Sequence, residues 1–294
     1  MNESLDDWRA GGRRFRRREH ALFYRDAGVA EAEVLLCMHG FPTASWDWHR
    51  LWPELCSRWR VIALDMPGYG FSDKPVEYNY SVVDQADICE ELLDALAVRH
   101  VHLLAHDVGD SVAQELLARQ SERVAAGDDR LTIESVCLLN GGVVPEAHHP
   151  TFTQRLLASP FGFLVSRLMT ERRFGASISV VFGAKTKPSA AELAELWSLV
   201  AFNDGQRIAH KLIGYIAERR RHRDRWVSAL RSNVPLRMVS GLDDPVSGAR
   251  MVKRLREEVP GVDAVGLPGI GHYPQLEDPA GVFRAYLEFR TSLL

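Results

Sequence analysis

Short apolar runs that stop at Gly or Pro alternate along this chain with segments of helical spacing. The apolar runs are residues 33–40 (EVLLCMHG), 60–68 (RVIALDMPG), 101–107 (VHLLAHD), 133–142 (IESVCLLNGG), 235–241 (PLRMVSG) and 263–269 (DAVGLPG). Between the second and third runs, SVVDQADICEELLDALA places its apolar residues on one helical face. Fully apolar strands separated by helices indicate a mainly parallel sheet covered on both faces.

The alternation stops between about residues 143 and 230, where the apolar spacing is helical and no strand-like run occurs. We therefore predict a core domain of residues 1–142 and 231–294, with residues 143–230 inserted as a helical cap. Such a cap would lie over the carboxyl ends of the strands, where open α/β sheets bind ligands. The basic cluster from Arg219 to Arg225 is interpreted as the solvated face of the last cap helix. The Arg-rich segment 11–28 is interpreted as a polar hairpin at the sheet edge.

Composition limits the function classes. A chain of 294 residues with 46% hydrophobic residues can form one large α/β domain with an insertion. Its net charge of −3 argues against a nucleic-acid binder. The polar, acidic first twelve residues and the lack of a long apolar run predict a cytoplasmic protein without a membrane span. The four cysteines fit no zinc spacing, so we expect no metal and no cofactor. The pattern leaves the oligomeric state open.

The clearest chemical motif is the turn Ala105-His106-Asp107-Val108-Gly109, which joins an apolar run to a helical segment. Small residues two before and two after Asp107 match the strained elbow that presents a nucleophile in hydrolases of this architecture. The alternative is that Asp107 only caps the following helix. The motif alone does not decide between these two interpretations.

A second motif, His39-Gly40-Phe41-Pro42, closes the first apolar run. In this architecture a loop after an early strand supplies one backbone N–H to an oxyanion hole, and the residue after the nucleophile supplies the other. We assign these two donors to Phe41 and Val108.

Two further motifs supply an acid and a base. In Gly241-Leu242-Asp243-Asp244-Pro245-Val246, either carboxylate is available to orient a histidine, and the position before Pro-Val favours Asp244. His272 follows the last apolar run in GIGHYPQLEDP, in a loop suited to a base. The order of nucleophile 107, acid 244 and base 272 is the order of this fold.

With these residues, the chain resembles the epoxide hydrolase and haloalkane dehalogenase branch of the α/β-hydrolase superfamily. More narrowly, it is similar to the family of mesoderm-specific transcript proteins. The phrases that carry the resemblance are HGFPTASWDW, VIALDMPGYGFSDKP, HDVGDSVAQELL, LTIESVCLLNGG, DRWVSAL, LDDPV and HYPQLEDP. The resemblance implies an Asp nucleophile at Asp107, an acid at Asp244, a base at His272 and a helical cap.

An Asp nucleophile suits attack on a saturated carbon of a small molecule, with an alkyl ester that a His-activated water then hydrolyses. Dehalogenases of this branch place Trp after the nucleophile and often Asn after the HG pair, where this chain has Val108 and Phe41. Trp197 and Trp226 in the cap are candidate substitutes, although cap tryptophans are more often hydrophobic filling.

Epoxide hydrolases use cap tyrosines as proton donors, and this cap offers Tyr215, with His148 as a candidate second donor. We therefore expect an epoxide hydrolase-like enzyme on an apolar substrate. A haloalkane dehalogenase with an atypical halide site is the first alternative. A ligand-binding or signalling protein on a hydrolase scaffold is the second.

Overall fold

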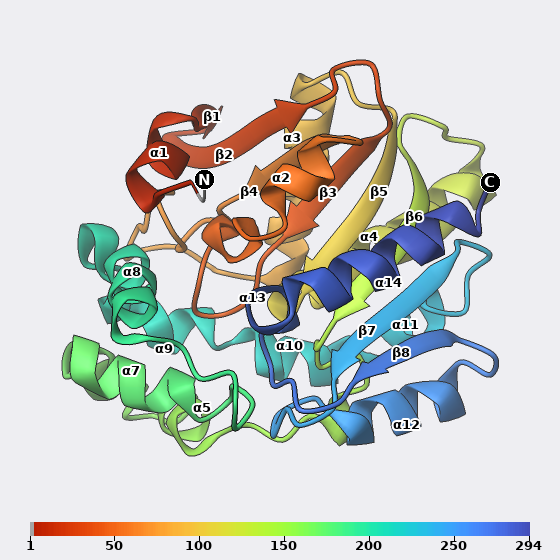
Figure 1. The fold of residues 1–294 in the computed structure, drawn as a ribbon. Coiled ribbons are helices and arrows are strands. Elements are labelled where there is room, and N and C mark those ends of the chain that lie inside the picture. The colour runs from red at the N-terminus through yellow and green to blue at the C-terminus, as the bar shows by residue number, and fades with distance from the viewer. Residues whose placement is uncertain (1–2) are drawn as a thin grey trace.

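The computed structural model describes residues 3–294, which form one twisted sheet with helices on both faces (Figure 1). Within these residues the sheet has eight strands in the order β1-β2-β4-β3-β5-β6-β7-β8. All pairs from β4 to β8 are parallel, whereas β2 runs antiparallel to β1 and to β4. The strands are β1 Arg13–Arg17, β2 His20–Gly28, β3 Val34–Met38, β4 Arg60–Leu64, β5 His100–His106, β6 Thr132–Leu139, β7 Leu236–Gly241 and β8 Asp263–Leu267. The predicted mostly parallel sheet and its edge hairpin, β1 with β2, are confirmed.

Two hydrophobic clusters lie on opposite faces of the sheet. The inward side chains of α3 and α4 belong to one cluster, and those of α2 and α14 belong to the other. The helices of the core are α1 Leu5–Ala10, η1 Ser45–Trp48, α2 Trp52–Cys56, α3 Val82–Ala95, α4 Val108–Ala126, α12 Ala249–Glu258, α13 Pro274–Glu277 and α14 Pro279–Thr291. Apolar strands that bury both faces in this way require cover on both sides.

Between β6 and β7 the described chain forms helices only. They are η2 Pro145–Ala147, α5 Phe152–Leu157, α6 Gly162–Arg167, α7 Glu171–Ser179, α8 Ala190–Ala201, η3 Phe202–Ile208, α9 Ala209–Leu212, α10 Tyr215–Arg221 and α11 Arg223–Ala229. Most of them, green to teal in Figure 1, cover one end of the sheet. Helix α11 instead packs along α4 of the core. The division of the chain into core and cap at residues 143 and 230 stays a prediction. Helix α11, which ends at Ala229, already packs on the core helix α4.

The connection from β5 to α4 is a tight turn with Asp107 at its tip. Asp107 has φ 49° and ψ −106°, a conformation that costs energy for a residue with a Cβ. Gly109 follows where α4 crosses β3, and a Cβ at this position would lie 2.5 Å from the Met38 carbonyl oxygen. The turn therefore depends on a glycine at 109, and it holds Asp107 at the carboxyl end of the central strand.

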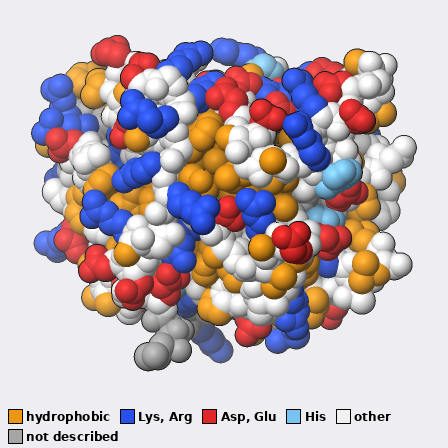
Figure 2. Space-filling view, turned by 90° about the horizontal axis from the view of Figure 1, so that it is seen from above, with side chains coloured by type: hydrophobic (Ala, Val, Ile, Leu, Met, Phe, Trp, Pro, Cys, Tyr) orange, Lys and Arg blue, Asp and Glu red, His pale blue; other side chains and the backbone are white. Residues whose placement is uncertain are grey.

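None of the helices formed by residues 3–294 has the length and apolar character needed to cross a membrane. Figure 2 shows one face of the molecule, on which basic and acidic side chains are interspersed. A cytoplasmic location stays a prediction.

We expect Gly109→Ala to lower the free energy of unfolding by about 1–3 kcal/mol, because the added methyl group must displace backbone that already packs closely. The matched control is Gly175→Ala in α7, where a Cβ would meet only an ordinary 3.4 Å contact. Alanine favours a helix, so this control should be neutral or slightly stabilising. Urea unfolding of both variants measures the difference, and equal effects would contradict the packing argument.

Candidate active site

The Asp107 side chain is 1% exposed and makes no capping hydrogen bond to α4. The helix-cap interpretation of Asp107 therefore fails. Its Oδ2 atom instead accepts a hydrogen bond of 3.1 Å from the Phe41 N–H. The Val108 N–H, at the start of α4, has no hydrogen-bond partner among residues 3–294. The two predicted oxyanion donors thus lie in the loop after β3 and at the elbow. The Phe41 N–H binds the carboxylate, and the Val108 N–H has no partner among the described residues.

His272 and Asp244 lie beside this carboxylate. The His272 Nε2 atom is 4.0 Å from Asp107 Oδ2, and its Nδ1 atom is 2.8 Å from Asp244 Oδ2. Asp244 also accepts hydrogen bonds from the Asn140 side-chain amide and from the N–H groups of Val246 and Ser247. This set of donors fixes the Asp244 carboxylate where it can orient the imidazole.

The neighbouring Asp243 has a different role, because it accepts a hydrogen bond from the Gly269 N–H in an exposed turn. Asp244, as the sequence predicted, is the carboxylate that contacts His272. The structure therefore brings together Asp107, Asp244 and His272, which the sequence analysis selected from three distant segments.

Burial and nearby charges have opposite effects on the pKa values of His272 and Asp107. Burial lowers the pKa of His272, but attraction by Asp244 and then Asp107 outweighs burial and raises it to about 9. Burial raises the pKa of Asp107, but Arg219 and then His272 outweigh this and lower it to about 2. At neutral pH Asp107 is a carboxylate and His272 an imidazolium.

Arg219 corrects the interpretation of the basic cluster as a solvated face. Its side chain is 2% exposed, and Nη2 donates to the Asp107 main-chain oxygen at 2.6 Å and to Oδ1 at 3.1 Å. Arg220 and Arg221, next to it on α10, are exposed. Sequence reasoning missed Arg219, although it lies one helical turn after Tyr215 and therefore on the same helix face.

Tyr215 and His148, the two candidate proton donors, are both buried near this carboxylate. Tyr215 is 1% exposed, its ring lies 5.8 Å from that of Phe41, and Gln154 donates to its hydroxyl at 3.5 Å. His148 is 7% exposed, and neither ring nitrogen has a partner among the described residues. Burial, followed by the nearby Arg219, lowers the pKa of His148 to about 3.

The two cap tryptophans lie away from the carboxylate. The Trp226 indole N–H donates to Glu115 of α4 at 2.8 Å, so it is already used in packing α11 on the core. Trp197 packs against Phe174 within the cap and does not line the cavity described below. Each ring packs against a neighbouring helix, which agrees with the favoured interpretation as hydrophobic filling and not with the alternative of a halide contact.

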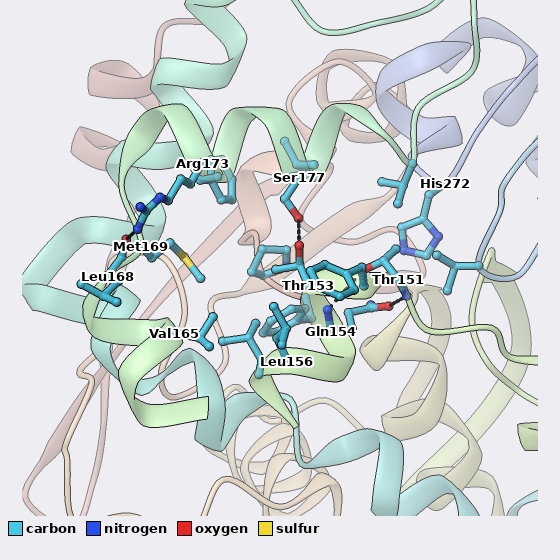
Figure 3. A pocket seen from close by; sticks show the side chains of 18 of the residues that line it. Thr151, Thr153, Gln154, Leu156, Val165, Leu168, Met169, Arg173, Ser177 and His272 are labelled. Atoms are coloured by element: carbon cyan, nitrogen blue, oxygen red, sulfur yellow. Dashed lines mark hydrogen bonds between the residues drawn. The ribbon is translucent and has the colours of Figure 1, made fainter. Parts of the chain in front are cut away.

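A cavity of about 390 Å³ lies between the cap and the core. In Figure 3, Arg173 lies at one end of the labelled side chains and His272 at the other. The core contributes Phe41, His272 and Tyr273 to the lining, and the cap contributes mostly apolar side chains. Because Phe41 and His272 also contact or approach Asp107, the cavity ends one side chain away from the carboxylate.

Among residues 3–294 no group of three His, Cys, Asp or Glu side chains is arranged to hold a metal ion.

Comparison with known proteins identifies the family. A sequence model of the alpha/beta hydrolase fold matches residues 33–127. The chain is 40% identical to the mesoderm-specific transcript protein of Mus musculus, over 99% of this chain and 89% of that protein. The chain belongs to the α/β-hydrolase family of mesoderm-specific transcript proteins. It is also 38% identical to LipZ of Mycobacterium tuberculosis, a provisionally assigned hydrolase, over 99% of this chain and 98% of LipZ.

Solved structures of other α/β hydrolases share the fold of this family member. The haloalkane dehalogenase DbeA from Bradyrhizobium elkani superposes with a TM-score of 0.77 at 21% identity, over 96% of this chain and 98% of DbeA. A provisionally assigned epoxide hydrolase from Klebsiella pneumoniae gives 0.78 at 20% identity, over 97% and 99%. At this level of identity the likeness extends to the fold alone.

The raised pKa of His272 predicts a pH-dependent stability. Its value of about 9 exceeds the 6.5 of an unfolded histidine. The extra stability is therefore fully present below about pH 6.5 and is lost as the pH rises through about 9. We expect the unfolding free energy of the wild type minus that of His272→Gln to fall by about 3 kcal/mol between about pH 6 and pH 10. Denaturant unfolding across this range measures it, and a constant difference would contradict the charge assignment.

Proposed function

We propose that this protein is a hydrolase with Asp107 as nucleophile and that it opens an epoxide on a small to medium apolar substrate. One observation carries the proposal: the Phe41 N–H holds one oxygen of the Asp107 carboxylate, and the His272–Asp244 pair lies 4.0 Å from that oxygen. A carboxylate can form an alkyl ester, and an oxyanion donor with a paired histidine can promote hydrolysis of that ester.

The first half-reaction forms that ester. Oδ2 accepts from the Phe41 N–H and Oδ1 from Arg219 Nη2. We assign the attack on a ring carbon to Oδ1, which leaves Oδ2 as the ester carbonyl oxygen beside the Phe41 N–H, and the carbon–oxygen bond of the epoxide breaks. The epoxide oxygen takes a proton from the Tyr215 hydroxyl. The imidazolium of His272 supplies the replacement proton and becomes neutral, as a base must be.

The second half-reaction restores the enzyme. Neutral His272 takes a proton from a water, and the hydroxide adds to the Asp107 ester carbonyl. Negative charge then builds on Oδ2, where the N–H groups of Phe41 and Val108 would stabilise it, each by about 3 kcal/mol. When this intermediate collapses, the bond between the Asp107 carbonyl carbon and the alkyl oxygen breaks. The departing oxygen takes the proton of the new carboxyl group, so the diol leaves, Asp107 is ionised again and His272 stays protonated as at the start.

The substrate class is supported by the cavity. Its 390 Å³ is within the range of small-molecule sites, and aliphatic and aromatic side chains dominate its lining. Haloalkane dehalogenation uses the same ester and is the alternative proposal, but the Trp226 N–H is occupied by Glu115. A binding protein without catalysis would form no ester at all, so trapping the ester separates the three readings.

We expect His272→Gln to accumulate an ester on Asp107, because the base for its hydrolysis is lost. Intact mass spectrometry after incubation with styrene oxide and with 1-bromohexane measures the adduct. An epoxide adds its whole mass, whereas a bromoalkane adds its mass less HBr. His272→Gln with Asp107→Asn is the control and should stay unmodified. An adduct mapped to a serine would contradict the nucleophile assignment, and no adduct from any substrate would favour a binding protein.

We expect Tyr215→Phe to lower kcat/KM for a reactive epoxide about 10²- to 10⁴-fold, because the leaving oxygen loses its proton donor. The matched control is Tyr286→Phe, a buried tyrosine of α14 whose hydroxyl accepts from Arg290 outside the site. Turnover rates and thermal unfolding are measured for both. Wild-type turnover by a folded Tyr215→Phe would rule out this role.

A further inference from the structure

The buried Arg219 has one nitrogen that nothing engages. Nε donates to the Ser111 hydroxyl at 2.7 Å and Nη2 donates twice to Asp107, but Nη1 is buried without a partner among residues 3–294. The guanidinium lies 4.5 Å over the Tyr215 ring. Buried donors in folded proteins are normally paired, so this nitrogen points to a partner that residues 3–294 do not supply.

His148 faces the same space. Both of its ring nitrogens are buried without partners, and a neutral imidazole carries one N–H donor. A Cβ built on Gly142 would lie 2.5 Å from Arg219 Nη1 and 2.9 Å from His148 Nδ1. Arg219 Nη1 and His148 Nδ1 therefore both lie against Gly142, beside the nucleophile, where a side chain on residue 142 would clash with them.

Ester formation changes the charge at this point. Arg219 and Asp107 are a fully buried ion pair, with side chains 2% and 1% exposed. When Asp107 becomes a neutral ester, the guanidinium remains buried without a counter-ion, which is strongly unfavourable. In the same step negative charge develops on the leaving group before it is protonated, so a new partial anion appears as the old one is lost.

We propose that Arg219 and His148 form an anion site, which stabilises the negative charge that develops on the leaving group as Asp107 is esterified. The inference rests on the proposed function and identifies the residues that would contact its leaving group. For an epoxide the anion is the alkoxide oxygen, which Arg219 holds while the Tyr215 hydroxyl protonates it. Arg219 then supplies a second contact to the leaving oxygen beside Tyr215, which is the one tyrosine in residues 143–230.

Asp107→Asn tests the site without any chemistry, because the amide mimics the neutral ester in size and charge. Its thermal unfolding is measured in sodium bromide and in sodium formate, with sodium gluconate keeping the ionic strength constant. We expect bromide or formate to raise its Tm by about 2–4 °C, as ligands that bind the folded state do. The wild type should respond much less, because its Asp107 carboxylate already neutralises the charge of the Arg219 guanidinium.

Two double variants control for the residues of the site. Asp107→Asn with Arg219→Gln should lose the anion response, whereas Asp107→Asn with Arg220→Gln should keep it, because Arg220 is exposed on the same helix. If Asp107→Asn does not fold, Asp107→Gly replaces it and leaves room for formate. No anion response in a folded variant, or an equal response in all variants, would overturn the proposal.

These outcomes are distinct from those of the trapping experiment. Absence of an ester in His272→Gln would remove the proposed function without affecting anion binding by Asp107→Asn. Absence of anion binding would remove the Arg219 site while leaving the trapped ester intact.

Discussion

The structure of the site depends on how one buried negative charge is compensated. A carboxylate out of water is unstable unless charges and donors surround it, and Asp107 is almost fully buried. Three groups serve it: the Arg219 guanidinium, the His272 imidazolium and the Phe41 N–H. Each group comes from a different part of the chain. The Asp107 carboxylate therefore holds together the cap, the last core loop and the loop after β3.

This compensation requires the fold to place Asp107 accurately. The central parallel strands end at one edge, so the loops after β3, β5, β7 and β8 meet there. The positive φ of Asp107 turns its side chain away from α4 and toward those loops. The strain of that turn is offset by the burial of α4 against the sheet, where Gly109 permits the close approach to β3.

Much of this arrangement could be predicted from local sequence signals. Strand ends marked by Gly or Pro located the elbow, and chain order located Asp244 and His272. Arg219 could not be found this way, because a run of arginines on a helix usually marks the solvated face and one member departs from it. For Trp226 the favoured interpretation was hydrophobic filling, but which helix it packs against could not be predicted, because the face that meets α4 depends on the packing of the whole cap.

The charges also order the two halves of the proposed reaction. In the resting site Asp107 helps to raise the pKa of His272 to about 9, which makes His272 a proton source and a poor base. Esterification removes the Asp107 charge and so lowers the pKa of His272, which favours the neutral imidazole that can accept a proton from water. The same loss of charge leaves Arg219 to act on Tyr215, whose pKa burial and Asp107 raise and Arg219 lowers. Neutralising one carboxylate thus lowers the pKa of both groups, which favours proton donation by Tyr215 and the neutral form of His272.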